Sequence, residues 1–285
     1  MSERQLSPVD YLVIGHVTHD LLPDGSCTVG GTAAYAGLTA AALGRRVGML
    51  TCAGPDLDAE TLKGRTAFVC CPAAATTTFE NRYAGGVRQQ SVRNVAGPLS
   101  PGDVPVAWRA APLVHIGPVM GECGPELVRL FAGRAFIGLT PQGWLRRADG
   151  AGHVIPGDWE EAEQLLPLVS AVVLSAEDLR NDWDRAAIWA RLTSLLVVTQ
   201  GAAGGTLFIE GTSHRFAAPE VVEVSPTGAG DVFAAVFFCV LSQGANPQQA
   251  AHRAACLAAR SVLRSGLDGV PDARDLAACG WSHLA

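Results

Sequence analysis

The sequence has little charge and no cluster of positive charge. Only 17% of its 285 residues are charged, and the formal net charge is −6. The longest basic runs are the pairs Arg45-Arg46 and Arg146-Arg147, which we expect to be solvent-exposed. A nucleic-acid-binding surface requires clustered lysine and arginine, so we expect no nucleic-acid partner.

Long apolar runs are also missing. The longest strongly apolar run, Val232 to Leu241, has about half the length that a membrane span needs. The first ten residues, MSERQLSPVD, contain no apolar core of a secretion signal. We therefore expect no membrane association and a cytoplasmic location.

Cysteine pairs with metal-binding spacing are absent. The eight cysteines are scattered and form no CxxC, so the sequence indicates neither a metal cluster nor a disulfide framework. We expect them to be reduced, small core residues. His16 and His19 form an HxxH, but at a strand exit rather than on a helix, which is a poor zinc motif.

What the sequence does contain is a regular alternation of two patterns. Short runs rich in Val, Ile and Leu predict buried strands, and amphipathic stretches between them predict helices. This alternation is typical of an α/β fold with a mainly parallel sheet, here in one domain over 1–285, whose ligands bind at the carboxyl ends of the strands. The predicted strands are 11–16, 47–54, 113–119, 135–140, 171–176 and 195–201, and the predicted helices are 32–44, 124–133, 158–169 and 184–192.

One region departs from this alternation. Residues 76–97 alternate polar and apolar side chains around Gly85-Gly86, which predicts a β-hairpin. Together with the turn-rich segment 17–31, it could form a small second sheet. Such a sheet is a lid over a site, an interface through which two copies pair as a homodimer, or a decorative hairpin.

A glycine-rich turn lies between 221–224, which we expect to be a strand, and the helical run 232–241. The unpaired amides at a helix N-terminus attract anions, and glycines let a phosphate approach them closely. Asp231, in the first turn of that helix, could take a proton from an attacking alcohol. The alternative is that Asp231 only complements the helix dipole.

Three motifs occur together and in a characteristic order: Asp20 with Gly30-Gly31, then Thr199-x-Gly201-x-x-Gly204, then PTGAGD at 226–231. In this order they resemble the ribokinase-like, PfkB-type carbohydrate kinases. The segments GHVTHDLLPDG, GGTAAYAG and PQGWLR are similar to the inositol kinase branch of that family, and 254–271 is similar to its C-terminal nucleotide-side helix and loop. The resemblance implies a three-layer fold, with helices flanking a mainly parallel sheet and a small β-sheet lid from 17–31 and 76–97.

The resemblance also implies an activity: transfer of the ATP γ-phosphate to a hydroxyl of a small polyol, a sugar or a cyclitol such as myo-inositol. Asp231 would be the base, and the lid would exclude water. The amides that hold the transferred phosphoryl group would be those of Gly228, Ala229 and Gly230. The acceptor would contact Asp20, Gly30, Gly31 and Tyr35.

The nucleotide and its Mg²⁺ would lie at other positions of the same motifs. Thr199, Gly201, Gly204, Thr227 and Cys256 would border the nucleotide. The family's Asn-x-x-Glu metal motif is present only as SAED, so Asp178, or Glu177 in second place, would help to hold Mg²⁺.

Other positions also depart from the family pattern. Ser225 stands where the family has Asp, and the Asn of the Gly-Gly helix is replaced by Thr32 or Tyr35. These departures leave two alternatives open: a ligand-binding or regulatory protein with weakened catalysis, and a nucleoside kinase that stacks its base on Tyr35, Phe79 or Tyr83. A dinucleotide oxidoreductase is disfavoured, because no GxGxxG follows the first strand.

Overall fold

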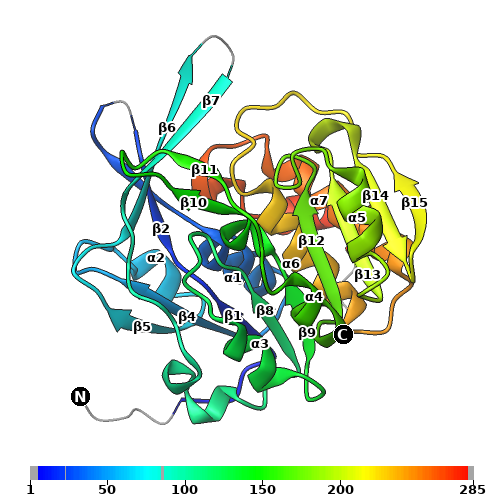
Figure 1. Cartoon of the computed structure of the whole chain (residues 1–285), viewed down its shortest axis with the longest axis horizontal. Coiled ribbons are helices and arrows are strands. Elements are labelled where there is room, and N and C mark those ends of the chain that lie inside the picture. The colour runs from blue at the N-terminus through cyan, green and yellow to red at the C-terminus, as the bar shows by residue number, and fades with distance from the viewer. Residues whose placement is uncertain (1–5, 23, 85–86, 282–285) are drawn as a thin grey trace.

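The computed structural model describes residues 6–22, 24–84 and 87–281 (Figure 1). A nine-stranded sheet runs through the molecule in the order β15-β14-β13-β12-β9-β8-β1-β4-β5. Its strands are β1 (Tyr11–Ile14), β4 (Val47–Ala53), β5 (Ala67–Pro72), β8 (Leu113–Ile116), β9 (Phe136–Leu139), β12 (Ala171–Ser175), β13 (Leu195–Thr199), β14 (Gly205–Ile209) and β15 (Thr212–Phe216). All neighbours are parallel except β13–β14 and β14–β15, which are antiparallel.

Helices cover both faces of this sheet. Successive side chains of a strand point to opposite faces, and the buried strands carry apolar side chains on both. On β1, Tyr11 and Val13 join one apolar cluster, whereas Leu12 and Ile14 join another. The first cluster includes side chains of α1 (Thr32–Ala42), α2 (Glu60–Lys63), α6 (Ala229–Leu241), α7 (Pro247–Ser261) and α8 (Ala273–Ala278). The second includes α3 (Pro125–Phe131), α4 (Ala162–Leu165) and α5 (Trp183–Trp189). The predicted three-layer α/β architecture is confirmed.

A second, four-stranded sheet has the order β3-β2-β6-β7. It combines β2 (Thr18–Leu21) and β3 (Cys27–Gly30) with β6 (Thr77–Ala84) and β7 (Val87–Asn94), and Figure 1 shows β6 and β7 reaching beyond the central sheet. We call it the lid sheet. It arises from the two segments that the sequence indicates, although the Gly85-Gly86 turn lies outside the described residues. A short hairpin of β10 (Arg146–Ala148) and β11 (Val154–Pro156) lies beside it.

Two predicted elements are wrong. Residues 221–224 form no strand, because the amides of Val224 and Ser225 donate to the carbonyl of Val262 instead of to a neighbouring strand. The helix expected over 158–169 is reduced to α4 and a 3₁₀ turn that contains Pro167, whose missing N–H prevents continuation.

The helix expected over 184–192 is present as α5, and the chain between β12 and this helix forms a turn. Arg180 and Asn181 adopt positive φ angles of 56° and 57°, which interrupt a right-handed helix. The helix begins at Trp183, and the side chain of Asp182 caps it by accepting from the amide of Arg185.

Among the helices of the described residues, none has the length and apolarity needed to cross a bilayer.

Candidate active site

The glycine turn before α6 has the geometry of an anion-binding loop. Gly228 is its N-cap, with a left-handed φ of 84°, and a β-carbon there would meet the ring of Tyr35. The amide of Ala229 donates to the carbonyl of Pro226 at 3.2 Å, so it is engaged within the turn itself. No hydrogen-bond partner among the described residues is found for the amides of Gly228, Gly230 and Asp231. A β-carbon on Gly230 would meet no atom within 4 Å, so the approach to these amides is open.

The carboxyl group of Asp231 has a pKa that is raised toward neutrality. Burial raises its pKa to about 6, against the opposing effects of the Thr32 hydroxyl and the Arg146 charge. The nearby carboxylates of Asp178 and Asp20 raise the pKa further. A carboxyl group with a pKa in this range can release and take up a proton near neutral pH.

The predicted acceptor residues converge on the same place. Asp20 and Asp231 both raise the pKa of the Tyr35 hydroxyl, after burial, which is the largest cause. A β-carbon on Gly30 would lie 2.5 Å from Oδ2 of Asp20, so glycine lets this strand pass close to the carboxylate. Gly31 has a φ of 88° and would collide with the carbonyl of His16 if it carried a side chain. Tyr35 is only 2% exposed, and its hydroxyl has no hydrogen-bond partner among the described residues.

The two glycines of the Thr-x-Gly-x-x-Gly motif differ in the space around them. Gly204 is required by the turn into β14, since a β-carbon would lie 2.1 Å from the carbonyl oxygen of Phe216. Gly201 has open space around it, which leaves it accessible to a ligand. Thr199 ends β13 beside Ser175 of β12, and its hydroxyl donates to the carbonyl of Leu174 at 3.4 Å. Thr199 and Gly201 therefore lie at the carboxyl edge of the sheet.

The two acidic residues of the SAED segment, Glu177 and Asp178, differ in their contacts and exposure. Asp178 accepts a hydrogen bond from the amide of Ser175 at 2.9 Å and another from Nε2 of Gln142 at 3.2 Å, and its charge acts on Asp231. Glu177 is exposed. Among the described residues, no three His, Cys, Asp or Glu side chains are grouped to hold a metal ion. A cation here would depend on Asp178 together with phosphate and water oxygens, a set that Mg²⁺ accepts.

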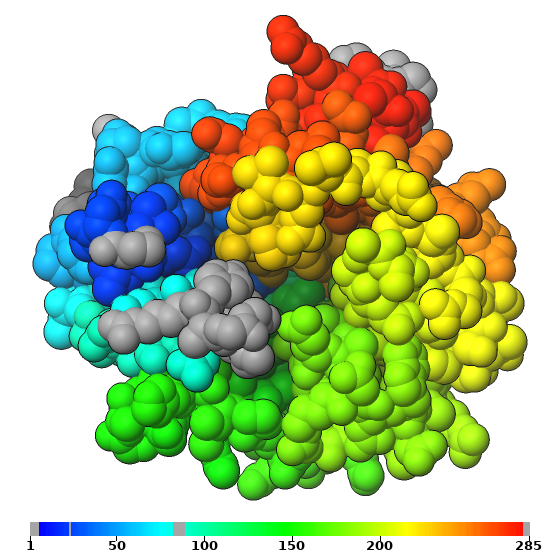
Figure 2. Space-filling view, turned by 90° about the horizontal axis from the view of Figure 1, so that it is seen from above, coloured from blue at the N-terminus to red at the C-terminus, as the bar shows by residue number. Residues whose placement is uncertain are grey.

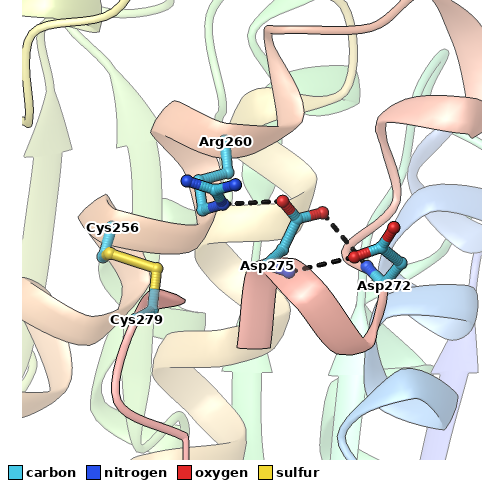
Figure 3. The surroundings of a disulfide bond; sticks show 5 residues. All are labelled: Cys256, Arg260, Asp272, Asp275 and Cys279. Atoms are coloured by element: carbon cyan, nitrogen blue, oxygen red, sulfur yellow. Dashed lines mark hydrogen bonds and ion pairs between the residues drawn. A yellow bond between two sulfur atoms is a disulfide. The ribbon is translucent and has the colours of Figure 1, made fainter. Parts of the chain in front are cut away.

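Cys256 is not the free thiol that the sequence predicts. It forms a disulfide with Cys279, which lies just after α8 (Figure 3). The packing of α8 against α7 brings the two α-carbons to 5.9 Å, supported by the ion pair of Arg260 with Asp275, and Asp275 also pairs with Arg264. The spacing of 23 residues gave no indication of this contact, because it is created by tertiary packing. Cys256 therefore has no thiol to offer to a nucleotide while the disulfide is intact.

Arg146 is a site residue that the sequence did not indicate. It is half-buried rather than solvent-exposed, and its charge acts on Asp231. The PQGWLR segment that contains it carries only a family resemblance. In Figure 2 the surface is hollowed where the lid sheet, in blue and cyan, meets the green and yellow parts of the chain. Parts of the chain that are far apart in the sequence thus border one depression.

The chain is similar to known proteins over most of its length. The family described as pfkB family carbohydrate kinase matches residues 145–273. The inositol 3-kinase of Oryza sativa subsp. japonica is 30% identical over 285 residues, covering 92% of this chain and 70% of the relative. The cytidine kinase of Thermococcus kodakarensis is 29% identical over 277 residues, covering 90% and 96%.

Solved structures share the fold. A pyrophosphate-dependent kinase of the ribokinase family, complexed with a pyrophosphate analog and myo-inositol, superposes with a TM-score of 0.78 at 22% identity, covering 91% of this chain and 98% of that one. A putative ribokinase II from E. coli, in complex with ATP and Mg²⁺, gives a TM-score of 0.74 at 18% identity, covering 95% and 98%. The chain therefore belongs to the pfkB family of carbohydrate kinases and is an enzyme that phosphorylates a hydroxyl group.

Proposed function

We propose that this kinase transfers the γ-phosphoryl group of ATP to a hydroxyl of a small polyol, with Asp231 as the base. The observation that supports this most directly is the position of Asp231. Its carboxylate lies at the N-terminus of α6 beside unpaired amides, and it interacts electrostatically with Asp20 and Tyr35 on the acceptor side. Base, anion loop and acceptor residues thus form one site.

The reaction follows from these positions. Asp20 accepts hydrogen bonds from acceptor hydroxyls, and the Tyr35 hydroxyl donates one. As the acceptor oxygen bonds to the γ-phosphorus, Asp231 takes the hydroxyl proton, and the bond from that phosphorus to the β–γ bridging oxygen breaks to release ADP. The amides of Gly228, Gly230 and Asp231 stabilise the charge on the transferred group, as does Arg146.

An apolar surface supports a nucleotide as the donor. Val221, Val222 and Val224 precede the glycine turn and are 40%, 84% and 63% exposed. Large exposed apolar groups of this kind commonly mark ligand-binding surfaces, and an adenine ring would cover them. Pyrophosphate has no base and would leave them in water. Replacing Val222 by Ser should therefore raise KM for ATP without changing the use of pyrophosphate.

Mg²⁺ would bind beside Asp178 and the donor phosphates. The ion would neutralise phosphate charge and thereby ease the approach of the acceptor oxygen. Asp178 suits this role better than Glu177, because only Asp178 interacts electrostatically with Asp231. Both oxygens of Asp178 already accept hydrogen bonds, which favours contact with the ion through water.

A cyclitol such as myo-inositol fits the acceptor side better than a nucleoside. A nucleoside would require an aromatic face for its base. Of the candidate rings with described side chains, Tyr35 packs against Gly228 and Phe79 lies beneath Arg146, with exposures of only 2% and 4%. Neither ring is available for stacking, which weighs against the nucleoside alternative.

The deciding experiment is a product screen over cyclitols, sugars and nucleosides, with ATP and pyrophosphate offered separately and Asp231→Asn as the inactive control. We expect ADP release that depends on a cyclitol or sugar. ATP binding without turnover on any acceptor would favour the regulatory alternative instead. Faster turnover of cytidine or another nucleoside would replace the polyol with that acceptor.

A further inference from the structure

Three separate parts of the chain hold the guanidinium group of Arg146. Its Nε donates to the carbonyl of Val119, beyond the end of β8, at 2.7 Å. Its Nη1 donates to Oε1 of Gln90, on β7, at 3.1 Å. The guanidinium carbon lies 4.8 Å from the ring centroid of Phe79, on β6. Two of the three contacts therefore come from the lid sheet.

Each of these partners is itself fixed. Phe79 is 4% exposed and packs in a small cluster with Val92 and Val119. The amide of Val119 donates to the buried carboxylate of Glu122 at 2.9 Å. This hydrogen bond fixes the backbone of Val119, whose carbonyl accepts from Arg146. The position of Arg146 is therefore determined by its surroundings.

The orientation of Gln90 is determined in the same way. Its Nε2 donates to Oδ1 of Asn81 on the neighbouring strand at 3.1 Å. With the amide nitrogen engaged there, the oxygen of the same side chain must face Arg146. The bond from Arg146 to Gln90 is thus built into the pairing of β6 with β7.

The positive charge held in this way acts on the carboxyl group of Asp231. The groups that act on Asp231 are the Thr32 hydroxyl and Arg146, which favour its charged form, and Asp178 and Asp20, which oppose it. Asp231 in turn acts on the phenols of Tyr11 and Tyr35. Among these groups Arg146 carries the positive charge, which a triphosphate donor requires close to the base.

We propose that Gln90 and Phe79 are positioning residues that orient Arg146 toward Asp231 and the transferred phosphoryl group. The lid sheet would then contribute to phosphoryl transfer as well as cover the acceptor. Because the lid sheet positions Arg146, the groups that stabilise the charge of the transferred phosphoryl group would all be in place only when that sheet packs against the core. This inference rests on the proposed kinase reaction for its kinetic test, but not for its titration test.

Gln90→Leu removes the acceptor for Arg146 and keeps the size of the side chain. We expect kcat to fall at least tenfold, KM for the acceptor to stay within threefold, and the acidic limb of the kcat/KM profile to move to higher pH. Gln89→Leu is the matched control, since Gln89 is the next residue of β7, is exposed, and points to the opposite face. Its profile should superimpose on that of the wild type.

A kcat unchanged in Gln90→Leu, or a raised acceptor KM at constant kcat, would overturn the proposal, because the residue would then only contact substrate or shape the lid. If Gln90→Leu does not fold, the pair Phe79→Leu and Phe79→Tyr replaces it, and only the tyrosine variant should retain the wild-type kcat.

If the wild type phosphorylates no polyol, the proposed function fails, but the inference remains testable. NMR titration of the Asp231 carboxyl should then still show a higher pKa in Gln90→Leu than in Gln89→Leu, and equal values would refute it.

Discussion

The ring of Tyr35 lies directly against the α-carbon of Gly228: a β-carbon on Gly228 would be 2.3 Å from Cε1 of that ring. A side chain at this position is therefore excluded twice, by the aromatic ring and by the left-handed backbone. Gly230, two residues later, has neither constraint, since a β-carbon there would meet no atom within 4 Å and its φ is ordinary for a helix. The two glycines of the turn consequently serve different purposes.

Substituting each glycine by alanine should separate folding from catalysis. Gly228→Ala should lower the free energy of unfolding by about 1–3 kcal/mol through strain and overpacking. Gly230→Ala should leave it unchanged or raise it by up to about 1 kcal/mol, because alanine favours the helix. Its methyl group would nevertheless obstruct the phosphoryl group, so kcat/KM should fall at least ~10-fold. Thermal melts and initial rates on both variants test this, and a fully active Gly230→Ala enzyme would contradict the anion-loop assignment.

Asp231→Asn should affect rate and stability in opposite directions. The amide cannot accept the hydroxyl proton, so kcat should fall by roughly 10²–10⁴-fold with little change in binding. The pKa of Asp231 in the folded protein, about 6, lies above its ordinary value of 3.8, so the native state binds this proton more tightly than the unfolded state. The charged carboxylate therefore costs stability as pH rises from about 4 through 6.

Removing that carboxylate should accordingly raise Tm at pH 7.5, by the equivalent of roughly 1–3 kcal/mol, and leave Tm almost unchanged near pH 3, where both states are mostly protonated. Turnover within threefold of wild type would refute the role of the base. The wild-type kcat/KM should fall on the acid side with a midpoint near the pKa of about 6.

Asp20→Ala should weaken the acceptor alone. A carboxylate that bonds one or two hydroxyls contributes about 1.5–3 kcal/mol, so KM for the polyol should rise tenfold or more. KM for ATP should remain close to wild type. The opposite pattern, with ATP binding impaired and acceptor binding spared, would mean that the donor and acceptor sides are reversed.

The two acids of the SAED segment should differ in a magnesium titration. Asp178→Asn should raise the Mg²⁺ concentration for half-maximal rate several-fold, because a neutral amide attracts the hydrated ion less strongly than a carboxylate. Glu177→Gln is the control, since Glu177 is exposed and does not act on Asp231. If both variants give curves superimposable on wild type, Asp178 has only its structural role in the turn with Ser175.

The Cys256–Cys279 disulfide should contribute to stability. For a separation of 23 residues, the chain-entropy treatment gives about 3 kcal/mol, although native strain can reduce this. Cys279→Ser should therefore lower Tm, and dithiothreitol should lower wild-type Tm to the same value while leaving the variant unaffected. Cys27→Ser, at an exposed free thiol, should behave as wild type. A wild-type Tm insensitive to reduction would contradict the expectation.

Much of the fold could be predicted from local patterns. Apolar runs identified each of the six predicted central strands, since a buried parallel strand has hydrophobic residues on both faces. Two predicted elements failed, one because of a tertiary contact and one because of a proline. The valines at 221–224 have strand-forming side chains, but their amides bond to the end of α7. The helix expected over 158–169 was shortened by Pro167, a local signal that apolar periodicity does not take into account.

The sequence motifs predicted which residues lie close together, whereas a charge whose position depends on packing was missed. Asp231, Asp20 and Tyr35 lie on α6, β2 and α1, and their electrostatic interactions indicate that they lie near one another. Arg146 was expected to be solvent-exposed because it belongs to an Arg-Arg pair, but of the two residues only Arg147 is exposed. No local signal indicates that Phe79 and Gln90, more than fifty residues earlier, would draw one arginine of that pair into the site.

The lid sheet also constrains the order in which the chain can fold. Its central pair is β2 with β6, in parallel register, with Thr18 opposite Thr77. The intervening segment contains α1, β4, α2 and β5, so closing this loop costs more entropy than forming the hairpin of β6 and β7. The complete sheet should therefore assemble late, after the core has docked, and open first in native-state hydrogen exchange. Destabilising the core on the β4–β5 side would then reduce the population of molecules able to enclose an acceptor, well before the protein as a whole unfolds.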